Sequence, residues 1–327
     1  MRLVTFGMAA EKPRLGALLR DGGVLDLDAA ADGAPPFQSM LSLIEAGPDA
    51  WEEARGLVRR AAAPCIRHAV HCRLLAPLPA PPQIRDFMCF EKHVIQAFGA
   101  AFRMKAARTA SPDEKAALIA QAEAFRPPPV WYERPLYYKA NRFSISGPGD
   151  TIRWPGYSRL MDYECELACV IGRTGADIRR EHALDHVFGY TIFNDFSARD
   201  AQGAEMPGGL GPAKGKDFDG ANAFGPCIVT ADEIPDPYGL PMIVRVNGEE
   251  RSRGNSRDMH WKFEDLIVYV SQGETLRPGE ILGSGTVGDG CGLESLRFLD
   301  DGDRVELEIP PIGVLENRVA RSHAGNA

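Results

Sequence analysis

Apolar and polar residues alternate along Leu160–Gly172, whose sequence is LMDYECELACVIG. Side chains of a strand point to opposite faces in turn, so this alternation predicts a strand whose odd positions form one wholly apolar face. The even positions carry the carboxylates of Asp162, Glu164 and Glu166. Like charges held this close repel each other, and more strongly when water is removed. These carboxylates therefore either face bulk water or hold a cation.

The rest of the chain reads as many short strands and few helices. Residues 2–27 show strand-like runs joined by turns, and residues 37–62 and 91–126 have helical patterns. From residue 130 onward, strand-like segments are separated by Gly, Pro and Asp, as in FGYTIFND, FGPCIVT, PMIVRVNGEER and DRVELEIPPIGVLEN. Strands without regularly alternating helices predict an α+β, β-rich fold and disfavour a doubly wound sheet.

A proline-rich segment suggests how the chain divides. LLAPLPAPPQI holds four prolines within six residues, which favours an extended connection. We therefore expect a small β-rich domain over residues 1–75 and a larger domain over 76–327. The sequence SPDE at Ser111–Glu114 is a capping box with proline at the first helical position, and it begins a second helix within the segment 91–126.

Composition narrows the classes of protein. The chain has 327 residues, 44% hydrophobic and 25% charged, which is typical of a globular protein. A formal net charge of −8 without a basic run argues against a nucleic-acid partner. We see no apolar stretch near the ~20 residues of a membrane span, and no signal-peptide pattern at the start. Seven cysteines without a CxxC pair indicate reduced thiols, so we expect a cytoplasmic protein.

A hard divalent cation is one of the two explanations for the row of acids. Glu164 and Glu166 lie two positions apart and reach a common point above the sheet. The strand-like FGYTIFND runs directly into Asp195, which is a natural third ligand. Carboxylate oxygens suit Mg²⁺, Mn²⁺ or Ca²⁺. A solvated strand face stays open at this point, and Asp162 is expected to brace the start of the strand.

Five motifs, in this order along the chain, resemble those of the fumarylacetoacetate hydrolase family: RDFMCFEKHV, DYECELACVIG, NDFSARDAQ, GKDF and SGTVGDGCGLE. The resemblance covers roughly residues 76–310. The N-terminal RLGALLRDGGVLDLD also resembles the small β-rich domain that precedes the catalytic domain in many members. The resemblance implies a mixed β-sandwich roll as the catalytic domain, a divalent metal with Mg²⁺ as the first choice, and a homodimer.

The resemblance also assigns roles to individual residues. It implies metal ligands at Glu164, Glu166 and Asp195, with Asp86 as an additional acid near the metal. His93 falls on the general base of the family and Glu294 on the acid that orients it. The remaining matches are polar groups around the substrate and the metal: Arg199, Gln202, Lys216 and Thr286. Taken alone, Arg199 could equally form an ion pair with Asp200 that closes a turn.

Three departures from the family pattern bear on the site. Many small members place a glutamate three residues after the histidine, where this chain has Gln96, so Glu294 is favoured as the orienting acid. Tyrosines that contact a substrate carboxylate in other members are replaced by Met88 and Met206, which implies a less polar substrate end. The segment 91–126 is longer than the lid of small members, and is either a lid over the site or a surface insertion.

The implied activity is hydrolysis of a carbon–carbon bond in a small 1,3-diketone or acylpyruvate, as in aromatic-compound catabolism. An imidazole suits deprotonation of water near neutral pH, and a divalent cation stabilises the enolate that leaves. Lys216 and Gln202 would stabilise the oxyanion. Decarboxylation or tautomerisation of a 2-oxo acid, and hydration of a 2-oxo-enoate, are alternatives within the superfamily. A metal-stabilised binding protein is a further alternative, which the joint presence of His93, Lys216 and Glu294 disfavours.

Overall fold

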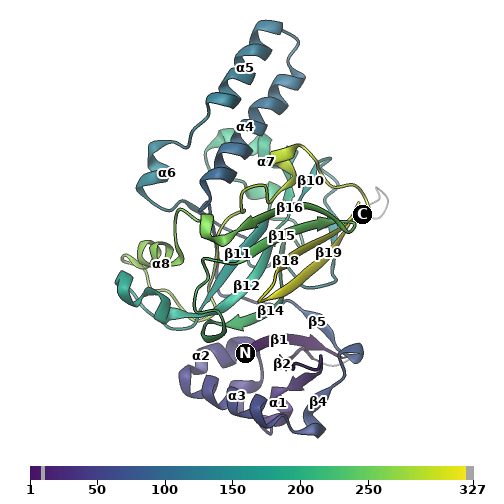
Figure 1. The fold of residues 1–327 in the computed structure, drawn as a ribbon, viewed down its shortest axis with the longest axis vertical. Helices are drawn as coiled ribbons and strands as arrows, with labels where there is room; N and C mark the ends of the chain where they lie inside the picture. The colour runs from purple at the N-terminus through teal and green to yellow at the C-terminus, as the bar shows by residue number, and fades with distance from the viewer. Residues whose placement is uncertain (9–11, 322–327) are drawn as a thin grey trace.

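The chain forms an α+β fold rich in strands, as predicted from its pattern. A computed structural model describes residues 1–8 and 12–321. Its largest element is a mixed sheet with the path β4-β3-β2-β1-β14-β12-β11-β17-β6-β7, which β5 and β8 join at β1 and β14 (Figure 1). The strands of this sheet are β1 (Arg2–Gly7), β2 (Arg14–Leu18), β3 (Val24–Asp26), β4 (Ile66–Arg67), β5 (Arg73–Leu75), β6 (Ile84–Phe87), β7 (Tyr137–Lys139), β8 (Ile145–Ser146), β11 (Cys165–Ile171), β12 (Val187–Asp195), β14 (Asn222–Thr230) and β17 (Ile281–Gly283).

A second sheet packs on the first and encloses the main core. Its strands are β9 (Thr151–Trp154), β15 (Pro241–Val246), β16 (Glu249–Asn255), β18 (Arg304–Ile309) and β19 (Gly313–Arg321). Strands β11, β12 and β14 contact β15, β18 and β19 across the interface. The odd positions of the predicted strand, from Met161 to Ile171, all lie buried in this core. The prediction of one wholly apolar face is therefore confirmed.

The N-terminal strands are continuous with the large sheet. β1 pairs antiparallel with β14, through Arg2 opposite Val229 and Leu3 opposite Ile228. The N-terminal helices are α1 (Leu27–Ala30), α2 (Met40–Ala46) and α3 (Pro48–Arg60), which lie at the lower end of the molecule (Figure 1). Residues 76–83 contain no helix or strand, in keeping with the density of prolines. The division into two domains near residue 75 stays a prediction.

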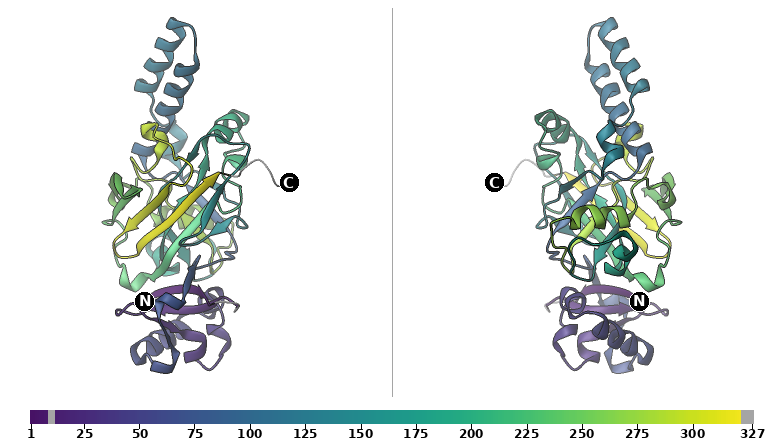
Figure 2. Two further views of the ribbon diagram at one scale, coloured as in Figure 1. Left: turned by 90° about the vertical axis from the view of Figure 1, so that its right-hand side faces the viewer. Right: turned by 90° about the vertical axis from the view of Figure 1, so that its left-hand side faces the viewer.

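The segment 91–126 forms a helical hairpin that projects away from the sheets (Figures 1 and 2). Its helices are α4 (Glu91–Arg108) and α5 (Pro112–Ala124). The Ser111 hydroxyl accepts a hydrogen bond from the Glu114 amide at 3.3 Å, so the predicted cap is present. The other helices are α6 (Pro129–Glu133), α7 (Arg199–Glu205), α8 (Phe263–Ser271) and α9 (Gly292–Ser295). Within the described ranges, no helix is long and apolar enough to cross a membrane.

Candidate active site

Three buried carboxylates converge where neighbouring strands of the large sheet end. Asp86 lies on β6, Glu166 on β11 and Asp195 at the end of β12, and β17 runs between β6 and β11. One oxygen from each carboxylate lies within 4.8 Å of the other two. Glu166 and Asp195 are 0% exposed and Asp86 is 5% exposed. The alternative of a solvated strand face is therefore wrong.

The carboxylate cluster, formed by Asp86, Glu166 and Asp195, has oxygens without hydrogen-bond partners that a cation could bind. In the described part of the chain, Asp86 Oδ1, Glu166 Oε1 and Asp195 Oδ1 are buried without a hydrogen-bond partner. Burial, reinforced by the negative charges of the other acids, raises the pKa of Asp86 to about 8 and that of Asp195 to about 6, and raises that of Glu166 well above its usual range. Unpaired buried charge is costly, and an all-oxygen donor set suits a hard divalent cation. The cluster thus fits the metal that the sequence predicts.

Gly283 on β17 leaves room for two of these carboxylates. A Cβ at this position would lie 2.6 Å from Asp86 Oδ1 and 3.0 Å from Glu166 Oε2. The neighbouring Gly285 amide donates to Glu166 Oε2 at 3.1 Å and holds that side chain in place. The glycine therefore allows the carboxylate cluster to form.

Gly283→Ala is expected to weaken binding of Mg²⁺ or Mn²⁺ by at least about tenfold, because the methyl group displaces two ligand side chains. Isothermal titration of each variant with either metal measures this effect. Gly203→Ala is the matched control, since a Cβ there meets nothing within 4 Å. Unchanged affinity in Gly283→Ala would show that the metal does not bind between these carboxylates.

Glu164 is held by two buried cations. Its Oε1 accepts a hydrogen bond from Arg199 Nη2 at 2.7 Å, and its Oε2 accepts one from Lys216 Nζ at 2.5 Å. Lys216 also bonds Asp195 and so joins Glu164 to the carboxylate cluster. Burial favours the neutral acid, but the charges of Lys216 and Arg199 outweigh it and hold the pKa of Glu164 well below its usual range. A metal-ligand role for Glu164 stays a prediction, because both its oxygens are paired in this structure.

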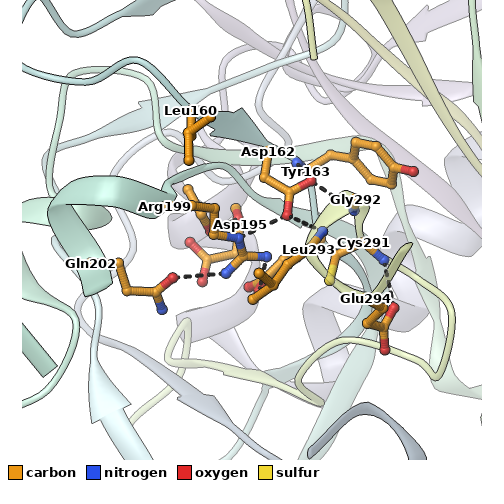
Figure 3. Close-up of polar contacts among 12 residues, drawn as sticks. Leu160, Asp162, Tyr163, Asp195, Arg199, Gln202, Cys291, Gly292, Leu293 and Glu294 are labelled. Carbon is orange, nitrogen blue, oxygen red and sulfur yellow. Dashed lines mark hydrogen bonds and ion pairs between the residues drawn. The ribbon is translucent and has the colours of Figure 1, made fainter. Parts of the chain in front are cut away.

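Asp162 braces the site, as expected, and Figure 3 shows its contacts. Its Oδ2 accepts hydrogen bonds from Arg199 Nε and from the Leu293 amide, both at 2.8 Å. Its Oδ1 accepts one from the Gly292 amide at 2.7 Å. Asp162 therefore fixes Arg199 and the start of α9 together. The alternative of an Arg199–Asp200 ion pair is wrong, since Asp200 instead accepts from the Ser158 hydroxyl and the Arg159 amide.

The predicted histidine–glutamate pair is present. His93 lies in the first turn of α4 with Nδ1 3.0 Å from Glu294 Oε1. Glu294 Oε2 accepts the Cys291 amide at 3.0 Å, so the carboxylate is held at both oxygens. His93 is 9% exposed and Glu294 is 8% exposed. A buried carboxylate at Nδ1 selects one histidine tautomer and leaves Nε2 as the proton acceptor.

The other residues that the sequence singled out occupy several environments. Gln202 Oε1 accepts from Arg199 Nη1 at 2.9 Å, and Thr286 is buried in the loop after β17. Gln96 donates to Asp289 Oδ1 at 2.6 Å instead of joining the His93–Glu294 pair. Met88 is half-buried and Met206 is 41% exposed. Their contact with a substrate stays a prediction.

Tyr138 on β7 is a site residue that the sequence did not indicate. Its hydroxyl donates to Asp195 Oδ2 at 2.6 Å, and its ring centroid lies 5.9 Å from Lys216 Nζ. Burial, together with the neighbouring acids, raises the pKa of Tyr138 well above its usual range, so the hydroxyl stays a donor. The short YYK strand belongs to none of the motifs. Only the pairing of β6 with β7, which sets Tyr138 opposite Asp86, brings it to the site.

Comparisons with known proteins relate the chain to one enzyme family. The family model for the C-terminal domain of fumarylacetoacetate (FAA) hydrolase matches residues 99–320. Oxaloacetate tautomerase fahd2 of Xenopus laevis is 34% identical over 322 residues, covering 98% of this chain and 90% of that protein. Oxaloacetate tautomerase YisK of Bacillus subtilis is 39% identical over 189 residues, covering 57% of this chain and 62% of that protein.

A solved structure adds information on the metal. Maleylpyruvate hydrolase from Sphingobium sp. SYK-6, in complex with manganese(II) and pyruvate, superposes with a TM-score of 0.71 at 26% identity, covering 99% of this chain and all of that one. The fold and the carboxylate cluster thus indicate a metal-dependent enzyme class. The chain belongs to the fumarylacetoacetate hydrolase family, as its motifs predicted, and is an enzyme of that superfamily. The manganese-bound relative and the carboxylate cluster together support a divalent metal.

Proposed function

We propose that the protein interconverts the keto and enol forms of a 2-oxo acid of the oxaloacetate type, with Mg²⁺ as its metal. The observation that carries this proposal is the pairing of His93 with Glu294 in a site that also holds three buried carboxylates, each with one oxygen that has no hydrogen-bond partner. The sequence placed hydrolysis first and tautomerisation among the alternatives. The tautomerase from Xenopus laevis, which aligns over 98% of this chain, favours the alternative.

The carboxylate cluster supplies the metal part of the proposal. Asp86, Glu166 and Asp195 would hold the cation, and their all-oxygen donor set also accepts Mn²⁺ or Ca²⁺. When bound, the cation supplies a Lewis acid for the carboxylate and 2-oxo oxygens of the substrate. Asp195 and Glu164 raise the pKa of Lys216 against the opposing effect of burial, so Lys216 stays charged. The positive charge of Lys216 would stabilise negative charge on the substrate, but Lys216 would not act as the general acid, because it holds its proton too tightly.

The His93–Glu294 pair supplies the proton transfer. In the keto-to-enol direction, His93 Nε2 takes a proton from the carbon next to the 2-oxo group and returns it to the 2-oxo oxygen. Glu294 accepts the hydrogen bond from Nδ1 and stabilises the imidazolium between the two transfers. The substrate keeps all its atoms, since one proton moves from carbon to oxygen. No water takes part in the reaction.

Hydrolysis of an acylpyruvate is the second candidate. The observation that favours it is the similarity to the manganese- and pyruvate-bound maleylpyruvate hydrolase. The same His93–Glu294 pair would then deprotonate a water instead of a carbon acid. The two candidates differ in product, since hydrolysis yields two acids and tautomerisation yields one isomer.

The test uses the purified full chain with Mg²⁺. The decay of enol oxaloacetate absorbance is followed after dilution from an organic solvent, and acylpyruvates are assayed for release of two acids. We expect accelerated decay of the enol that stops with EDTA and returns with added Mg²⁺. Cleavage of acylpyruvates without any effect on enol oxaloacetate would overturn the tautomerase proposal in favour of hydrolysis.

A further inference from the structure

A second group of possible metal ligands lies at the His93–Glu294 pair. One donor atom each from His93, Cys291 and Glu294 lies within 4.8 Å of the other two, and all three residues are buried. This soft-donor cluster, formed by His93, Cys291 and Glu294, is distinct from the carboxylate cluster, with which it shares no residue. Its sulfur, nitrogen and oxygen donors differ from the three oxygens of the other group.

The donor types select the metal. Thiolate, imidazole and carboxylate together are typical of Zn²⁺, whereas Mg²⁺ and Ca²⁺ take oxygen ligands. Zn²⁺ bonds of 2.0–2.3 Å in a tetrahedron place neighbouring donors about 3.3–3.8 Å apart. His93 Nδ1 and Glu294 Oε1 are already 3.0 Å apart, so the approach of the Cys291 thiol would complete a three-ligand set. Three protein ligands leave the fourth position open, as in many zinc sites.

The turn around Cys291 holds its thiol in this place. The Cys291 side chain accepts the Glu294 amide, and the Cys291 amide donates to Glu294 Oε2 at 3.0 Å, which together form a capping box at the start of α9. Arg199 lies close enough to favour the thiolate, although burial and the neighbouring acids raise the pKa of the thiol. Binding of a soft metal would therefore release a proton from Cys291 to solvent.

We propose that His93, Cys291 and Glu294 form a Zn²⁺ site, and that Zn²⁺ bound there inhibits the enzyme while Mg²⁺ occupies the carboxylate cluster. The inhibitory part rests on the proposed function, because it requires His93 to be the proton carrier. The ion takes Nδ1 of His93, the nitrogen that bonds Glu294, and the proton of Nδ1 moves through solvent to Nε2. Nε2 can then no longer accept a proton, and the Glu294 carboxylate no longer stabilises the imidazolium. The doubly charged ion is balanced by one thiolate and one carboxylate, so the occupied site is neutral.

Binding is tested without turnover by titrating the full chain with Co²⁺ in saturating Mg²⁺. Cobalt–thiolate ligation gives an intense near-ultraviolet charge-transfer band, which oxygen ligation at the carboxylate cluster does not give. We expect one equivalent of this band in the parent chain and its loss in Cys291→Ser. Serine keeps the cap of α9 because its hydroxyl accepts the Glu294 amide. Cys72→Ser, which removes a half-buried thiol elsewhere, should keep the band.

Inhibition is tested by adding Zn²⁺ to each variant in excess Mg²⁺. The turnover rate of the same variant in Mg²⁺ alone serves as the reference. In Cys291→Ser, we expect the inhibition constant for Zn²⁺ to rise by more than roughly 10–100-fold. That range is the loss of metal affinity when a residue that only supports a ligand is replaced, and Cys291 is proposed as a direct ligand. A cobalt band that persists in Cys291→Ser would overturn the site, whether or not the protein turns over oxaloacetate. Zn²⁺ inhibition relieved by more Mg²⁺ would overturn the inhibitory role, since it indicates competition at the carboxylate cluster.

Discussion

Glu166→Gln is expected to weaken binding of Mg²⁺ or Mn²⁺ severely and to make the metal-free protein more stable. Glu166 is buried on β11, and its Oε1 has no hydrogen-bond partner in the described part of the chain. A glutamine of the same shape keeps the acceptor for the Gly285 amide and removes one of three mutually repelling acids. The loss of a direct ligand should weaken metal affinity beyond the roughly 10–100-fold effect of an outer-shell change.

The two opposite effects are measured by thermal unfolding in EDTA and in saturating Mg²⁺. The parent chain should gain much stability on adding the metal, and Glu166→Gln should gain little. Glu306→Gln is the matched control, because Glu306 lies on β18 in the other sheet. An unchanged response to Mg²⁺ in Glu166→Gln would contradict the assignment of Glu166 as a ligand.

The pH dependence of the metal-free protein follows from the same acids. Burial raises the pKa of Asp195 to about 6 and of Asp86 to about 8, so the folded chain keeps protons that the unfolded chain has lost. The contribution of these two acids to stability in EDTA is therefore highest below the ordinary carboxyl range and falls as pH rises through 6 and 8. Glu166→Gln should flatten this fall, because it removes one source of repulsion.

Short-range pattern predicted the parts of the site that lie on single elements. The alternation at residues 160–172 predicted which side chains face the core between the two sheets, and the run into Asp195 predicted a third acid at a strand end. The strand itself is interrupted: β10 (Met161–Asp162) pairs with β13 (Ser197–Ala198), and β11 begins at Cys165. At the break, the Glu164 amide donates to the Asn194 side chain at 3.0 Å, which no alternation could show.

The rest of the site depends on contacts between residues that lie far apart in the sequence. Glu164 meets Lys216 and Asp195 meets Tyr138 only because the sheet path and the loop after α7 bring segments more than fifty residues apart together. The continuity of β1 with β14 is likewise a pairing between distant strands. Helical pattern predicted both helices of the 91–126 hairpin but not the packing of α4 against α9, which is a contact between distant parts of the chain.

His93→Gln is expected to lower turnover by about 10²–10⁴-fold while leaving the affinity of the carboxylate cluster for Mg²⁺ unchanged. Glutamine can still bond Glu294 but cannot accept and return a proton. Glu294→Gln should also lower turnover, because a neutral amide no longer stabilises the imidazolium. His182→Gln is the control, since His182 is exposed and pairs with Asp185.

A structural role for His93 and a role in proton transfer predict different results in deuterated water. If His93 carries the proton, then the parent enzyme should catalyse exchange of hydrogen for deuterium in the substrate, at the carbon next to its 2-oxo group. His93→Gln should lose this catalysed exchange while still binding Mg²⁺. If His93 only supports α4, exchange, metal affinity and thermal stability should fall together. Undiminished exchange in a folded, metal-bound His93→Gln would show that another group moves the proton, and Glu294 would then hold a histidine that has no part in the chemistry.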